Sequence, residues 1–222
     1  DALIFDFSEE GMQASDRVRP ISDLTAIALY YTNRGAESLQ AGAADESLEW
    51  LRTAVALDPE LAHAWVNLGV GLRRTGDPRG AEAAYRKALE LAPKFTPALL
   101  NLADLYRANG LDAKARPLLQ QAIRQTPGDP APQHAMGLLL VREKDLGAAV
   151  GHLRQAAELA PGNIRYGYVY AVALWESGKR QEAVATLELL LMEHPGSREL
   201  TAALASYYRE LGEEEKLREL QQ

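Results

Sequence analysis

Apolar and small residues recur along most of the chain with the period of an α-helix. Two such stretches follow each other between residues 62 and 92. The apolar face of the first consists of Trp65, Leu68, Gly69 and Leu72, and that of the second of Ala81, Ala84, Tyr85 and Ala88. In the link between them, Gly76 suits the end of a helix, while Asp77 and Pro78 suit the start of the next. The pattern predicts two helices joined by a tight turn.

The same pattern recurs every 34 residues, and prolines that cannot continue a helix mark the spacing: Pro59, Pro93, Pro127, Pro161 and Pro195. A small residue stands 24 positions before each proline: Gly35, Gly69, Ala103, Gly137 and Ala171. A large one stands eight before: Leu51, Tyr85, Leu119, Leu153 and Leu187. The predicted repeats are 28–61, 62–95, 96–129, 130–163 and 164–197, with a terminal helix pair at 198–222, so that residues 24–222 form one array. Since copied units bury their apolar faces against their neighbours, the expected fold class is all-α.

With these columns in register, the chain resembles the tetratricopeptide repeat (TPR) family, in its bacterial type. Residues 65–69 (WVNLG), followed by Tyr85, Ala88 and Pro93, are close to the family consensus. Pro117, early in a second helix, and Gly167, in place of a bulky residue in a first helix, depart from it. The resemblance implies a right-handed superhelical solenoid of antiparallel helix pairs whose first helices line a concave groove. It also implies a non-catalytic scaffold that binds an extended peptide or partner segment in that groove.

Three asparagines occupy the same groove position in successive repeats: Asn33, Asn67 and Asn101. A side-chain amide donates and accepts hydrogen bonds, so it can pair with a peptide backbone of any sequence. A row of such amides would hold an extended chain in register. The alternative is that asparagine serves packing or solubility here, because it also belongs to the family consensus.

Arginines occupy five further groove positions: Arg73, Arg74, Arg107, Arg142 and Arg165. Asp104 is the only acid that maps to the groove between Asn33 and Arg165. We therefore expect a basic inner face that attracts carboxylates, although the protein as a whole is acidic. The alternative is that these arginines lean toward the acidic outer face.

Aromatic residues mark the groove side of the fifth repeat. Tyr168, Val172 and Trp175 follow i, i+4, i+7 spacing, and two exposed aromatics would resemble the anchors of protein interfaces. The alternative is a place in the core. His134 also maps to the groove, but no two histidines have the i, i+4 spacing of a helical metal site, so none is predicted.

Composition narrows the class of protein. A net charge of −7 disfavours a general nucleic-acid binder, and no apolar run reaches the length of a membrane span. The absence of cysteine removes thiol chemistry and leaves the compartment open. No catalytic motif occurs, so we expect no enzymatic activity and no cofactor, and a protein or peptide as partner.

Residues 1–23 do not fit the array. Residues 3–7 (LIFDF) predict a short strand, and residues 8–20 a polar loop. The stretch 19–35 is similar to the junction where some bacterial transglutaminase-like domains run into a repeat array, and the chain starts at Asp1 rather than at methionine, as a processed product or a piece would. The array could then present substrates as the accessory domain of a transglutaminase-like or peptidase-like enzyme. Two alternatives remain: a free arm, and self-assembly through the N-terminal strand or the ends of the array.

Overall fold

The computed structural model describes residues 22–220, and these form twelve α-helices and no strand. The helices are α1 (Asp23–Gln40), α2 (Ala44–Leu57), α3 (Ala62–Arg74), α4 (Pro78–Leu91), α5 (Thr96–Ala108), α6 (Asp112–Gln125), α7 (Pro130–Arg142), α8 (Leu146–Leu159), α9 (Ile164–Glu176), α10 (Arg180–Glu193), α11 (Arg198–Leu211) and α12 (Glu214–Leu220). The all-α prediction is confirmed. The strand predicted at residues 3–7 lies outside the described residues.

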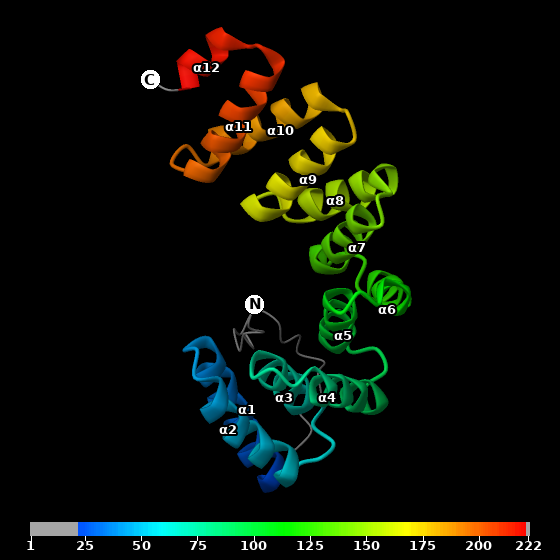
Figure 1. Ribbon diagram of the computed structural model, residues 1–222. Coiled ribbons are helices and arrows are strands. Elements are labelled where there is room, and N and C mark those ends of the chain that lie inside the picture. The colour runs from blue at the N-terminus through cyan, green and yellow to red at the C-terminus, as the bar shows by residue number, and fades with distance from the viewer. Residues whose placement is uncertain (1–21, 221–222) are drawn as a thin grey trace, which may run out of the picture. The chain divides into compact units, whose positions relative to one another are not determined.

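Consecutive helices pack in pairs, as the repeat predicts. Helix α1 packs on α2, α3 on α4, α7 on α8, α9 on α10 and α11 on α12, and Figure 1 shows the chain doubling back within each pair. Each second helix also contacts the first helix of the following pair, for example α2 with α3 and α8 with α9. The described chain divides into two compact units: one contains the helices up to Leu111 (α1–α5) and the other those from Asp112 onward (α6–α12).

The column of small residues is explained by the contact between the two helices of a pair. A Cβ atom added to Gly35 would lie 2.5 Å from Cγ of Leu51, and one added to Gly137 would lie 2.5 Å from Cγ of Leu153. At Gly69 an added Cβ would collide with the ring of Tyr85. The large residues of the other column are fully buried, and those opposite a glycine lie directly against its backbone.

The departure at Gly167 is compensated elsewhere in the same repeat. Four repeats carry alanine five positions before the proline, whereas the fifth carries Leu190 there. A Cβ at Gly167 would lie 2.8 Å from both δ-carbons of Leu190, so the leucine fills the volume that glycine leaves. The two substitutions are one exchange of large and small residues across a helix contact.

The turns within pairs have one unusual member. Gly76 and Gly178 follow the first helices of their pairs with φ of 84° and 85°, in the left-handed region that glycine adopts without strain. At the corresponding place after α7 stands Lys144, with φ of 64°. Pro117, the other departure from the pattern, lies inside α6, which continues from Asp112 to Gln125.

Candidate peptide-binding site

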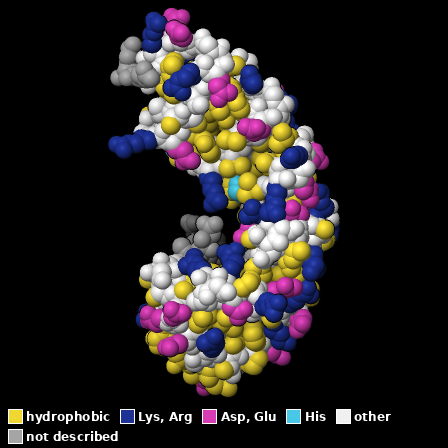
Figure 2. All heavy atoms as spheres, viewed as in Figure 1, with side chains coloured by type: hydrophobic (Ala, Val, Ile, Leu, Met, Phe, Trp, Pro, Cys, Tyr) yellow, Lys and Arg dark blue, Asp and Glu magenta, His cyan; other side chains and the backbone are white. Residues whose placement is uncertain are grey.

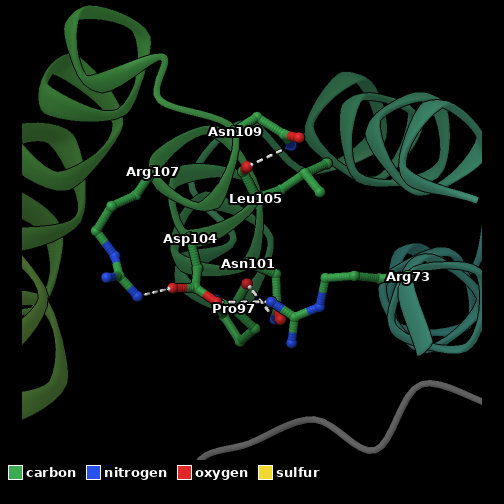
Figure 3. Close-up of polar contacts among 7 residues, drawn as sticks. All are labelled: Arg73, Pro97, Asn101, Asp104, Leu105, Arg107 and Asn109. Atoms are coloured by element: carbon green, nitrogen blue, oxygen red, sulfur yellow. Dashed lines mark hydrogen bonds and ion pairs between the residues drawn. The ribbon is translucent and has the colours of Figure 1, made fainter. Parts of the chain in front are cut away.

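The strongest polar cluster on the first helices joins α3 to α5 in the first unit (Figure 3). Nη1 of Arg73, in the last turn of α3, lies 2.6 Å from Oδ2 of Asp104 on α5. Nη2 of Arg107, one turn further along α5, lies 2.5 Å from Oδ1 of the same carboxylate. In Figure 3 the two guanidinium groups approach Asp104 from opposite sides. The groove acid noted in the sequence is thus the centre of a two-arginine clamp.

The electrostatics of this clamp favour an ionised carboxylate and leave positive charge over. Partial burial by itself raises the pKa of Asp104, but hydrogen bonds from Arg107 and Arg73, with their charges, outweigh it and hold the pKa below its usual value. Both arginine side chains are 34% exposed and the Asp104 side chain 42%, so solvent reaches all three groups. Two positive charges and one negative leave a net charge of +1 in the cluster.

The three asparagines differ in what the structure offers them. Asn33 is exposed on α1, and Asn67 is partly buried on α3. Nδ2 of Asn101, beside the clamp, donates to the carbonyl of Pro97 at 2.8 Å (Figure 3). That bond uses one N–H of an amide that has a second N–H and an acceptor oxygen. The Asn101 side chain thus already makes a hydrogen bond within its own helix. The predicted pairing of the three asparagines with a peptide backbone stays a prediction.

A buried hydroxyl behind the clamp escaped the sequence analysis. Tyr85 is fully buried, and its Oη has no hydrogen-bond partner among the described residues. Burial raises its pKa to about 12, and the charges of Arg73, Asp104 and Arg74 act on it, so the hydroxyl lies close to the cluster. The sequence did hold a signal: the other repeats place leucine in this column, and only Tyr85 adds a polar end.

Two other predicted groove arginines are tied to the protein itself. Arg74 donates through Nη1 to the backbone carbonyl of Leu39 in the last turn of α1, which also accepts the backbone N–H of Gly42. Nε of Arg142 on α7 lies 3.0 Å from Oδ2 of Asp112 at the start of α6. Arg165, in the first turn of α9, is exposed.

The aromatic pair predicted on α9 is not an exposed pair. Trp175 is only 9% exposed, because the ring of Tyr207 from α11 stacks on it with centroids 3.8 Å apart and planes 8° from parallel. The guanidinium of Arg180 lies 5.2 Å from the centroid of the Trp175 ring. The predicted exposure of Trp175 is therefore wrong, and the reason is that the terminal pair covers it. Tyr168 and Val172 are partly buried, and Figure 2 shows hydrophobic side chains over α9 and α11.

His134 is also less accessible than predicted. It is 7% exposed, and its ring centroid lies 4.8 Å from that of Tyr166 on the next first helix. Within residues 22–220, no group of three or more histidine, aspartate or glutamate side chains could hold a metal ion. No helix in that part of the chain is both long and apolar enough to cross a membrane.

Comparison with known proteins gives one consistent family. A family model described as tetratricopeptide repeat matches residues 72–139 and 140–207. The photosystem I assembly protein Ycf3 of Cyanophora paradoxa is 31% identical over 150 residues, which are 66% of this chain and 75% of Ycf3. The probable biofilm formation methyltransferase WspC of Pseudomonas putida is 33% identical over 118 residues, 50% of this chain but only 28% of WspC. PilF of Pseudomonas aeruginosa superposes with a TM-score of 0.79 at 19% identity, over 90% of each chain, which shows a shared fold.

Proposed function

Because this chain belongs to the tetratricopeptide repeat family, whose members are typically protein–protein interaction scaffolds, we propose that it binds an extended, acidic segment of a partner protein along α1, α3 and α5. The observation that carries the proposal is the clamp of Arg73 and Arg107 on Asp104, which places two partly exposed guanidinium groups on neighbouring first helices. Arginine is the residue best suited to recognise a carboxylate, because its planar fork offers paired donors.

Arg73 has donors left for a partner. Its guanidinium carries five N–H groups, and Asp104 accepts one bond from it. A carboxylate of the partner segment would bind the remaining donors of Arg73, and the net positive charge of the cluster would attract it. Asn33, Asn67 and Asn101 would pair with the backbone of the same segment and keep it extended. The arginines would thus select the side chains of the partner segment by charge, and the asparagine amides would hold its backbone in an extended conformation.

The proposal is tested by titrating the protein with a short acetylated and amidated peptide of alternating Glu and Ala in a calorimeter. We expect the pair Arg73→Gln and Arg107→Gln to weaken binding by about tenfold or more, because it removes two charge-assisted contacts. The matched control is Arg52→Gln with Arg79→Gln, which removes the same charge from exposed positions on the second helices of the same unit. Equal affinity of both double variants would overturn the proposal, as would equal binding of a Gln/Ala peptide.

A second candidate function follows from the match to WspC, a probable methyltransferase of which this chain spans 28%. The repeat array could be the accessory domain of a larger enzyme and present peptide substrates to it. The coding sequence that flanks these 222 residues decides the matter. A catalytic domain in the same reading frame supports this candidate, and a reading frame without one removes it.

Self-association is favoured by one exposed surface. Leu24, Ile27 and Tyr30 lie at i, i+3, i+6 on α1 and are 56%, 45% and 59% exposed. Three apolar side chains on the outer face of the first helix are suited to a contact between copies. Light scattering over a dilution series would show a concentration-dependent mass in that case, and the mass of one chain throughout would rule the association out.

A further inference from the structure

A cavity of about 440 Å³ opens on the second unit, and none of the residues predicted for the groove lines it. Its walls are α6 and α8, the second helices of their pairs, and its floor is α7. Met136 and Leu140, one turn apart on α7, form an apolar floor and are each 3% exposed. The volume falls in the range of small-ligand sites, roughly 300–1,000 Å³.

The wall formed by α6 is basic. Arg116, Gln120 and Arg124 follow i, i+4, i+8 spacing, so they lie in a row on one face of the helix. The two guanidinium groups belong to positions about 12 Å apart along the axis, with an amide between them. Ile123 adds an apolar side chain to the same wall. A row of this composition can hold an anionic group beside an apolar one.

Two acids, Glu143 and Asp145, stand beside the cavity together with its two arginines. Arg116 donates through Nη2 to Oε2 of Glu143, in the turn after α7. Oδ1 of Asp145, which lines the cavity, accepts the backbone N–H of Ala148 at 3.2 Å and caps α8. Arg124 makes no ion pair with any residue between 22 and 220. Arg124 is therefore the cation most open to a ligand.

His152 on α8 faces this basic wall. Its Nδ1 lies 2.7 Å from Oε1 of Gln133, and since an amide oxygen only accepts, Nδ1 carries the proton. Burial lowers the pKa of His152, and the charge of Arg116 lowers it further. The imidazole is thus neutral at neutral pH, and the positive charge of Arg116 lies near it. The neutral ring does not repel an anion. Its NMR signals will shift when a charged group binds in the cavity.

We propose that this cavity binds a carboxylate carried on an apolar group. Arg124 holds the carboxylate, Gln120 donates to it from the same face of α6, and Ile123 with the accessible edges of Met136 and Leu140 receives the apolar part, while Arg116 stays paired with Glu143. The ligand is either a free aliphatic acid or the C-terminal residue of a polypeptide that ends in a large apolar side chain. This site is independent of the first unit, because all its lining residues belong to the second unit and it requires one terminal anion rather than an extended segment.

The test is a titration with three probes: octanoate, N-acetyl-leucyl-leucine, and the amide of that dipeptide. Binding is measured by calorimetry, and the imidazole signals of His152 are followed by NMR. We expect at least one of the two acids to bind and to shift the His152 signals, while the amide has no effect. If only octanoate binds, the ligand is a free aliphatic acid. If only the dipeptide acid binds, the ligand is the C-terminal residue of a polypeptide.

Two variants locate the site. Arg124→Gln should weaken binding by about tenfold, as expected for the loss of one charge-assisted contact. Ala148→Leu should fill the cavity from α8 and abolish binding, and circular dichroism verifies that both variants are folded. The controls are Arg154→Gln, at an exposed position of α8 outside the cavity, and Ala185→Leu, at an exposed position of α10. The proposal is overturned if neither acid binds, if the amide binds as well as the acid, or if the variants bind like the controls.

Discussion

The two compact units present different chemistry at matching places of the repeat. On α3 and α5 of the first unit, partly exposed arginines close on Asp104. On α9 of the second unit, the corresponding face carries Trp175, which α11 covers with Tyr207. A groove position is therefore exposed or buried according to what the next first helix places against it. The difference teaches that the first unit leaves charged side chains within reach of solvent, while the second packs its aromatic side chains against each other.

The largest expected effect concerns Trp175. If it belongs to the core of the second unit, Trp175→Ala should lower the free energy of unfolding by about 3–5 kcal/mol, because it removes a stacked, buried ring. Urea denaturation measures this change. Leu189→Ala, at a 58% exposed position of the same unit, should change it by no more than about 0.5 kcal/mol. Similar, small effects of both variants would show Trp175 to be a surface residue after all.

The second prediction contrasts two buried tyrosines. In the second unit, Oη of Tyr208 donates to Oε1 of Glu188 at 2.6 Å, so Tyr208→Phe should cost about 1–2 kcal/mol. In the first unit, the hydroxyl of Tyr85 has no partner within residues 22–220, so Tyr85→Phe should leave stability unchanged or raise it by about 1 kcal/mol. The same chemical change is thus expected to destabilise the protein in the second unit but not in the first. A loss of stability in both variants would mean that the Tyr85 hydroxyl is already satisfied.

Prediction from sequence succeeded where spacing sets the contact. The 34-residue period located the helix pairs, because the proline, the small residue and the large residue each act through the backbone or through volume. It identified Asp104 as the groove acid but not the clamp, since side-chain pairing depends on rotamers that spacing does not determine. It gave Trp175 the wrong exposure, because Tyr207 comes from the terminal pair, where the repeat is least regular. The sequence did not predict that Leu190 compensates for Gly167, because this requires knowing that the two residues are in contact.

The third prediction compares the turns of the two units. Lys144 has φ of 64°, a region that costs a residue with a side chain about 1–2 kcal/mol. Lys144→Gly should therefore stabilise the second unit by about 0.5–1 kcal/mol after the entropy of glycine is subtracted. In the first unit, Gly76→Ala should destabilise by about 1 kcal/mol, because φ is 84° there. Thermal unfolding of the two variants checks both signs, and a destabilising Lys144→Gly would contradict the account of this turn.

The smallest expected effect is the contribution of Asp104 to stability. Because its folded pKa is lowered, the carboxylate stabilises the protein at pH values above the ordinary pKa of aspartate, and this contribution is lost as pH falls through the lowered folded pKa. At neutral pH, Asp104→Asn should thus lower the free energy of unfolding by at most about 1 kcal/mol, because solvent screens the clamp. At pH values below the lowered folded pKa, the substitution should not change it. Urea denaturation across this pH range measures the difference. Glu49→Gln, at an exposed position of α2, is the control for lost charge, and a cost of Asp104→Asn that does not depend on pH would contradict this explanation.

The central claim is that the first unit, and not the second, takes the acidic segment of a partner. NMR titration with the Glu/Ala peptide tests it most directly, by following the Nε–Hε signals of Arg73 and Arg107 together with the indole N–H of Trp175. We expect both arginine signals to shift along one saturation curve while the indole signal stays in place. A shift of the Trp175 indole with unmoved arginine signals would contradict the account.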